Sequence, residues 1–138
     1  MADICMDEKL LKKIKSDYPD LKFLSGRKFS FRPPRTIVIG PEEENSPLLL
    51  LHEIGHALCN HRSFAIDAER IKMERQAWEK AREIAPNYGV EFDDEVVESE
   101  LDSYRDWLDK KSRCPACKLT RYQTPDGVYH CPFCENYK

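Results

Sequence analysis

The strongest constraint on the fold is the nine-residue stretch Leu50–Leu58, which reads LLHEIGHAL. As a helix, it places His52 and His56 one turn apart on one face, where two imidazoles can hold one Zn²⁺. Glu53 points to an adjacent face, where a carboxylate can accept a proton from a metal-bound water. The surrounding side chains are apolar, so the helix should be buried, and buried imidazoles need a metal or a partner. A core helix that happens to carry two histidines is the weaker interpretation, because H-E-x-x-H on an apolar helix is a fairly specific zinc signature.

Length and composition set the class of protein. A chain of 138 residues with 41% hydrophobic and 34% charged residues is typical of one globular domain, or one domain with a small appendage. No apolar run approaches the roughly 20 residues that a membrane span needs. The first residues lack the charged-then-apolar pattern of a secretory signal. We therefore expect a cytoplasmic protein with no membrane partner.

The cysteines divide the chain. Four of them form two C-P-x-C pairs separated by thirteen residues: Cys114, Cys117, Cys131 and Cys134. In an intracellular chain this spacing predicts a closed, structural zinc site rather than disulfides or a redox pair. The charge also changes here, since residues 110–138 carry a net +4 and residues 1–109 a net −7. The sequence thus predicts a metal-binding domain over 1–109 and a zinc ribbon over 110–138.

Hydrophobic periodicity and turn residues predict the remaining elements. The expected fold class is α+β, with a small sheet before the His52–His56 helix and long helices after it. The expected helices cover 7–18, 47–58, 64–85 and 93–109, and the expected strands cover 21–24, 28–31, 36–39, 119–124 and 128–130.

The strand over 36–39 has two interpretations. Prolines beside a strand favour an edge position, and the pair Pro33 and Pro34 comes shortly before this one. An edge strand could pair with an extended peptide. The alternative is a strand that only completes the sheet.

A catalytic zinc usually takes three protein ligands and leaves one position for water. His61 is close, but a third histidine in the H-E-x-x-H-x-x-G-x-x-H arrangement would come one residue later, and Cys59 stands where its glycine would be. Glu74 lies in the apolar stripe of the next helix, where a carboxylate is costly unless it meets a cation. The small residues Ala77 and Ala81 would let the two helices approach closely. We therefore predict Glu74 as the third ligand.

The segments His52–His56 and Glu74–Trp78 resemble the gluzincin metallopeptidases, most closely the compact minigluzincin subgroup. The resemblance covers roughly residues 20–108. It implies a zincin-like metallopeptidase domain, with a small sheet, an active-site helix and a following helix that carries the glutamate ligand. A zinc ribbon behind an H-E-x-x-H domain is also similar to the SprT-like DNA-associated proteases. Those use a third histidine, for which only His61 and His130 are available downstream.

These residues predict a zinc-dependent peptidase, active or latent, that acts on a peptide or protein substrate. One catalytic Zn²⁺ would be held by His52, His56 and Glu74. Glu53 would be the general base that activates water and passes the proton to the leaving amine. Three side chains are candidates to stabilise the oxyanion in the transition state, although core packing suits the tyrosine as well: Tyr104, His61 and Arg105.

The ribbon leaves three roles open. It could stabilise or cover the domain, it could occupy the substrate groove, or it could bind nucleic acid or a protein. With a zincin domain that is degenerate or only senses a ligand, the third role would make the chain a binding module rather than an enzyme. Basic and aromatic side chains would carry this role through phosphate contacts and base stacking. They are Lys110, Lys111, Arg113, Lys118, Arg121, Tyr122 and Tyr129.

Overall fold

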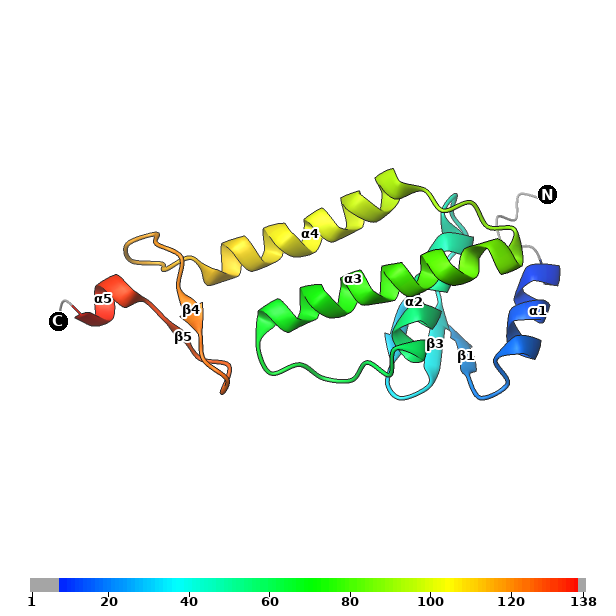
Figure 1. The fold of residues 1–138 in the computed structure, drawn as a ribbon, viewed down its shortest axis with the longest axis horizontal. Helices are drawn as coiled ribbons and strands as arrows, with labels where there is room; N and C mark the ends of the chain where they lie inside the picture. Colours follow the sequence, from blue (N-terminus) through cyan, green and yellow to red (C-terminus); the bar gives the residue numbers. More distant parts are fainter. Residues whose placement is uncertain (1–7, 137–138) are drawn as a thin grey trace. The chain divides into compact units, whose positions relative to one another are not determined.

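The structure is a computed structural model that describes residues 8–136. Cys5 and the expected first residue of the N-terminal helix lie outside the described residues. The element order is α1 (Glu8–Asp17), β1 (Lys22–Ser25), β2 (Ser30–Arg32), β3 (Thr36–Ile39), α2 (Ser46–Leu58), α3 (Asp67–Ile84), η1 (Ala85–Tyr88), α4 (Asp94–Ser112), β4 (Tyr122–Gln123), β5 (Tyr129–His130) and α5 (Pro132–Asn136) (Figure 1). The mixed α+β class is therefore confirmed.

The chain forms two compact units. Among the described residues, one combines 8–62 with 75–93, and the other combines 63–74 with 94–136. Residues of α3 belong to both units. The predicted domain boundary between residues 109 and 110 stays a prediction.

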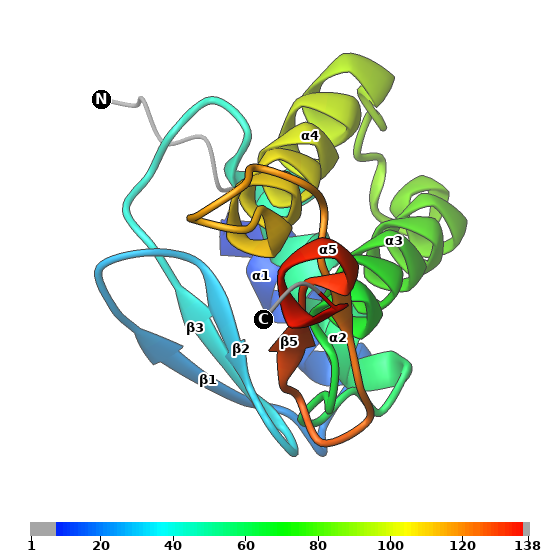
Figure 2. The same ribbon diagram turned by 90° about the vertical axis from the view of Figure 1, so that its left-hand side faces the viewer.

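The sheet of the first unit has the strand order β1-β3-β2 (Figures 1 and 2). β1 pairs in parallel with β3, and β2 pairs antiparallel with it. Ile37 and Val38 in β3 are buried, because the middle strand receives neighbours on both sides. Of the two interpretations of this strand, the edge position is wrong, and the strand completes the sheet from its centre. Pro33 and Pro34 fall in the turn between β2 and β3, where the missing N–H groups take nothing from the ladder.

α2 packs against β2 and β3 and is buried over most of its length. Pro47 lies in its first turn, as predicted, where the absent N–H costs no hydrogen bond. Asn45 occupies the N-cap but makes no side-chain capping bond, and the Ser46 hydroxyl instead accepts a hydrogen bond from the Glu43 N–H. Gly55 faces α3 so closely that a Cβ there would clash with the Ala77 carbonyl oxygen. The expected close approach of the two helices therefore depends on a glycine as well as on Ala77.

The second unit joins the start of α3 to α4 and the cysteine-rich segment. Asp67 is buried, and its carboxylate accepts hydrogen bonds from Tyr129 at 2.7 Å and from Lys111 at 2.9 Å. Burial opposes ionisation of this carboxyl group, but the Tyr129 hydroxyl and the Lys111 ammonium outweigh it and lower the pKa of Asp67. The Asp67 N–H also donates to the Gln123 side chain at 2.6 Å. A single residue thus fastens the ribbon hairpin to the first turn of α3.

The long helices depart slightly from expectation. α3 begins at Asp67 rather than near residue 64, and α4 continues to Ser112. The short elements η1 and α5 were not expected, since a single turn leaves too little periodicity to detect. Among the described residues, no helix is long and apolar enough to cross a membrane.

Candidate metal centres

Helices α2 and α3 bring together the three side chains that the sequence singled out as ligands. His52, His56 and Glu74 each offer one donor atom, and these atoms lie within 4.8 Å of one another. All three residues are at most 7% exposed. Glu74 is the last residue of the segment 63–74. Helix α3 continues from it without a break into residues that belong to the first unit.

The donor set fits a transition metal. Two imidazoles and one carboxylate form a set that catalytic zinc sites use, with one position left for water. Donors at about 2.0 Å from a tetrahedral ion are about 3.3 Å apart. Small side-chain rotations would close the present spread of up to 4.8 Å. These residues are therefore compatible with a bound metal ion.

Aromatic rings fix the two imidazoles. Trp78 stacks on His52 with ring centroids 4.1 Å apart and planes inclined by 7°. Phe31, from β2, stacks on His56 at 5.8 Å and 9°. These stacks oppose large reorientations of the two imidazoles and still allow the small rotations that a metal would require.

Glu53 lies beside the first imidazole. Its Oε2 is 3.3 Å from Nδ1 of His52, and the residue is 7% exposed. A proton on that nitrogen would be held by the carboxylate, which leaves Nε2 of His52 to face a metal. The side chain that the sequence selected as the general base is therefore placed next to the candidate metal ligands.

His61 lies close to the group but is not one of its donors. Its Nδ1 is 2.9 Å from Nδ1 of His56, and its Nε2 is 2.9 Å from Oε1 of Gln76. The sequence offered His61 as a ligand or an oxyanion stabiliser. In the structure both of its ring nitrogens face other side chains.

The two remaining candidates for stabilising the oxyanion belong to the second unit. Arg70 lies over the Tyr104 ring at 5.1 Å and over the Trp107 ring at 4.9 Å. Arg105 pairs with the exposed carboxylates of Glu98 and Asp102. Packing and surface ion pairs account for these side chains, so their role in catalysis stays a prediction without support.

The four cysteines of the ribbon form a second group. Their sulfurs lie within 4.8 Å of one another, with Cys114 and Cys134 at 3.7 Å and Cys117 and Cys131 at 3.5 Å. These separations exceed a disulfide bond of about 2.05 Å and match the roughly 3.8 Å between thiolates around a tetrahedral Zn²⁺. The geometry favours a metal over disulfides, as the spacing predicted.

Charge in this cysteine group also favours a cation. Backbone N–H groups of Cys117 and Ala116 point at the Cys114 sulfur and lower its pKa to about 6. The neighbouring sulfurs raise the pKa of Cys134 to about 12. Crowded sulfurs cannot all ionise unless a positive ion offsets their repulsion.

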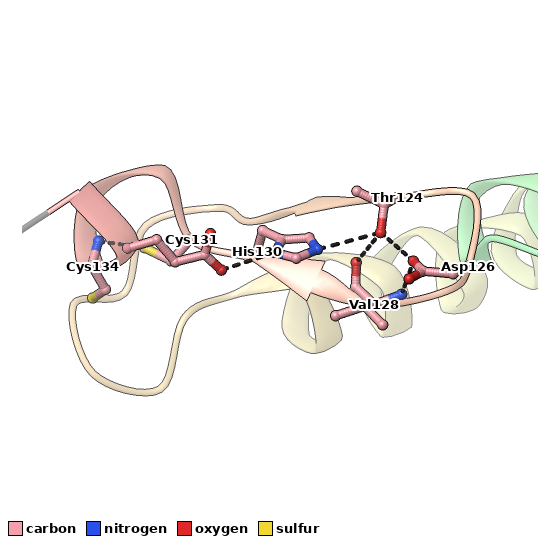
Figure 3. A network of polar contacts seen from close by, with 7 residues as sticks. Thr124, Asp126, Val128, His130, Cys131 and Cys134 are labelled. Atoms are coloured by element: carbon pink, nitrogen blue, oxygen red, sulfur yellow. Dashed lines mark hydrogen bonds and ion pairs between the residues drawn. The ribbon is translucent and has the colours of Figure 1, made fainter.

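Polar contacts tie the ribbon hairpin to this group (Figure 3). His130 contacts Thr124 through Nε2 at 3.3 Å and Glu135 through Nδ1 at 2.9 Å. Thr124 also bonds to Asp126, which accepts the Val128 N–H at 3.2 Å. His130 is thus a structural link between the hairpin and α5.

Part of the predicted basic set is already engaged within the second unit. Lys111 pairs with Asp67, and Arg121 donates to the backbone carbonyls of Lys111 and Ser112 while its guanidinium lies over Tyr129. Tyr122 and Phe133 remain exposed.

Sequence reasoning did not select Gln76 or Phe31. Both act through contacts between elements, and no local spacing indicates which residue of β2 or α3 will face an imidazole. No protein-family model matches the chain, and no curated protein or solved structure matches it either.

Proposed function

We propose that the chain is a zinc-dependent peptidase whose metal is held by His52, His56 and Glu74. The observation that carries the proposal is the buried convergence of these three donors next to the Glu53 carboxylate. Two imidazoles, a ligating carboxylate and a nearby unligated carboxylate are the parts that hydrolysis with a metal-activated water requires. The sheet against α2 and the glutamate on α3 are also what a zincin-like fold would provide.

The chain's own residues would divide the work. The imidazoles and Glu74 would fix the position of the ion, with Trp78 and Phe31 holding the two rings. When bound, Zn²⁺ would supply Lewis acidity to water and to the scissile carbonyl. Glu53 would turn from Nδ1 of His52, accept a proton on a carboxylate oxygen and deliver it to the leaving amine.

The test combines metal analysis with turnover. The zinc-replete protein is expected to hold two zinc ions per chain and to cleave a mixture of internally quenched peptides. Glu53→Gln should keep both ions and lose about 10²–10⁴-fold in rate, as expected for removal of a general base. Glu44→Gln, in the exposed loop before α2, is the matched control. A single zinc per chain, or full activity of Glu53→Gln, would overturn the proposal.

A second function, nucleic-acid binding by the ribbon, is favoured by exposed side chains. Tyr122 is 53% exposed and Phe133 48% exposed, and Lys110, Arg113 and Lys118 are also exposed. Aromatic faces could stack on unpaired bases while the cations contact phosphates. Binding to single-stranded DNA should weaken as salt rises and weaken further in Tyr122→Ala. Binding that ignores both changes would contradict this function.

A further inference from the structure

His61 is a buried histidine that neither donor group uses. It follows α2 and is 8% exposed. One ring nitrogen meets His56 and the other meets Gln76, each at 2.9 Å. All three residues belong to the first compact unit. His56, His61 and Gln76 therefore form a continuous chain of polar contacts that ends at a candidate metal ligand.

The number of ring protons determines which atom donates and which accepts in each of these hydrogen bonds. A hydrogen bond between two ring nitrogens needs one proton between them. If His56 binds a metal through Nε2, that nitrogen gives its lone pair and the ring proton sits on Nδ1. His56 Nδ1–H then donates to His61 Nδ1. A neutral His61 consequently carries its proton on Nε2, and donates it to Oε1 of Gln76.

The reverse arrangement would block metal binding. If a hydrogen-bond donor faced His61 Nε2, the His61 proton would move to Nδ1 and point at His56. Nδ1 of His56 would then have to accept, which leaves the proton on Nε2 and no lone pair for a metal. An acceptor at position 76 thus selects the ligating form of His56.

We propose that His61 and Gln76 are positioning residues that hold His56 as the Nδ1–H tautomer, with Nε2 presented to a metal. This inference rests on the metal binding of the proposed function but not on hydrolysis. It also explains why His61 is absent from the group of three donors. Partners that hydrogen-bond to a metal ligand typically contribute 10–100-fold to metal affinity.

Matched substitutions separate hydrogen bonding from packing. His61→Asn keeps an acceptor oxygen near the place of Nδ1, whereas His61→Leu removes it. Gln76→Glu keeps an acceptor for Nε2–H, whereas Gln76→Met does not. Chelator competition for the zinc outside the cysteine group should show about 10–100-fold weaker binding for His61→Leu and Gln76→Met. His61→Asn, Gln76→Glu and the exposed control Glu79→Gln should stay close to the wild type.

A direct reading of the tautomers needs no substitution. Long-range ¹H–¹⁵N NMR spectra of the zinc-loaded protein should show His56 protonated on Nδ1 and His61 protonated on Nε2. The inference would be overturned if His61 were protonated on Nδ1, or if a His61 nitrogen showed the chemical shift of a zinc ligand. Unchanged zinc affinity in both His61→Leu and Gln76→Met would overturn it as well. These results are distinct from failure of the proposed function, in which zinc binds with the expected tautomers but Glu53→Gln and the wild type are equally inactive.

Discussion

At the scale of single residues, Glu74 is the strongest indication that the site binds a metal. It is 7% exposed in the stripe of α3 that also holds Ala77 and Trp78. A carboxylate buried this deeply would be costly without a cation or hydrogen-bond donors nearby. The imidazoles of His52 and His56 in α2 lie beside it, and together the three side chains could bind a metal cation.

Glu74→Gln should therefore weaken zinc binding by more than the 10–100-fold expected for residues that only hydrogen-bond to ligands. The amide lacks the charge that offsets Zn²⁺, although it keeps the shape of the side chain. Metal analysis after dialysis should find one zinc per chain, retained by the cysteines. Retention of two ions would show that Glu74 is not a ligand.

At the scale of elements, the contact between α2 and α3 depends on Gly55. The Ala77 carbonyl oxygen lies 2.3 Å from the position that the Cβ of any other residue would take. Helix packing at this distance keeps the histidines of one helix within reach of the glutamate of the next.

Gly55→Ala should destabilise the protein by about 1–3 kcal/mol through overpacking, less the up to about 1 kcal/mol that alanine gains in a helix. Urea unfolding followed by circular dichroism measures the change. The zinc outside the cysteine group should also be held more weakly, since the helices must separate. A variant as stable as the wild type would mean that α3 moves at little cost.

The hydrogen bond from Tyr129 of the ribbon to Asp67 of α3 leads to a prediction about pH. Burial, and then the bond to the Asp67 carboxylate, raise the pKa of Tyr129 to about 12. Because the folded value lies above the usual value near 10, this contact stabilises the fold fully below about pH 10 and is lost as the pH rises through about 12. Absorbance titration at 295 nm should show a late ionisation step that Tyr129→Phe lacks. A wild-type titration that matches the variant's near pH 10 would contradict the contact.

At the scale of the whole molecule, the two groups of candidate metal ligands differ in their side chains and in how the fold assembles them. The four cysteines come from one short segment, residues 114–134, whereas the histidine group joins residues of two helices. A small ribbon without an extensive core would depend on a bound metal ion to fold.

Cys114→Ser should therefore remove one zinc and unfold the ribbon while the histidine group keeps its ion. The expected signs are loss of dispersed amide signals from residues 113–136 and retention of zinc that Glu74→Gln would lose. Loss of both ions from Cys114→Ser would show that the two groups are interdependent.

The sequence alone determined those features that depend on near neighbours. The spacing of His52 and His56 follows from one helical turn, and the spacing of the four cysteines follows from two tight turns on a hairpin, so both groups could be predicted from the order of residues. Glu74 could be selected because a charged residue interrupted an apolar stripe. Only the tertiary structure decided that β3 lies in the middle of the sheet and that Phe31 stacks on His56. It also decided that His61 faces His56 and Gln76, because contacts between distant segments depend on packing that no local spacing encodes.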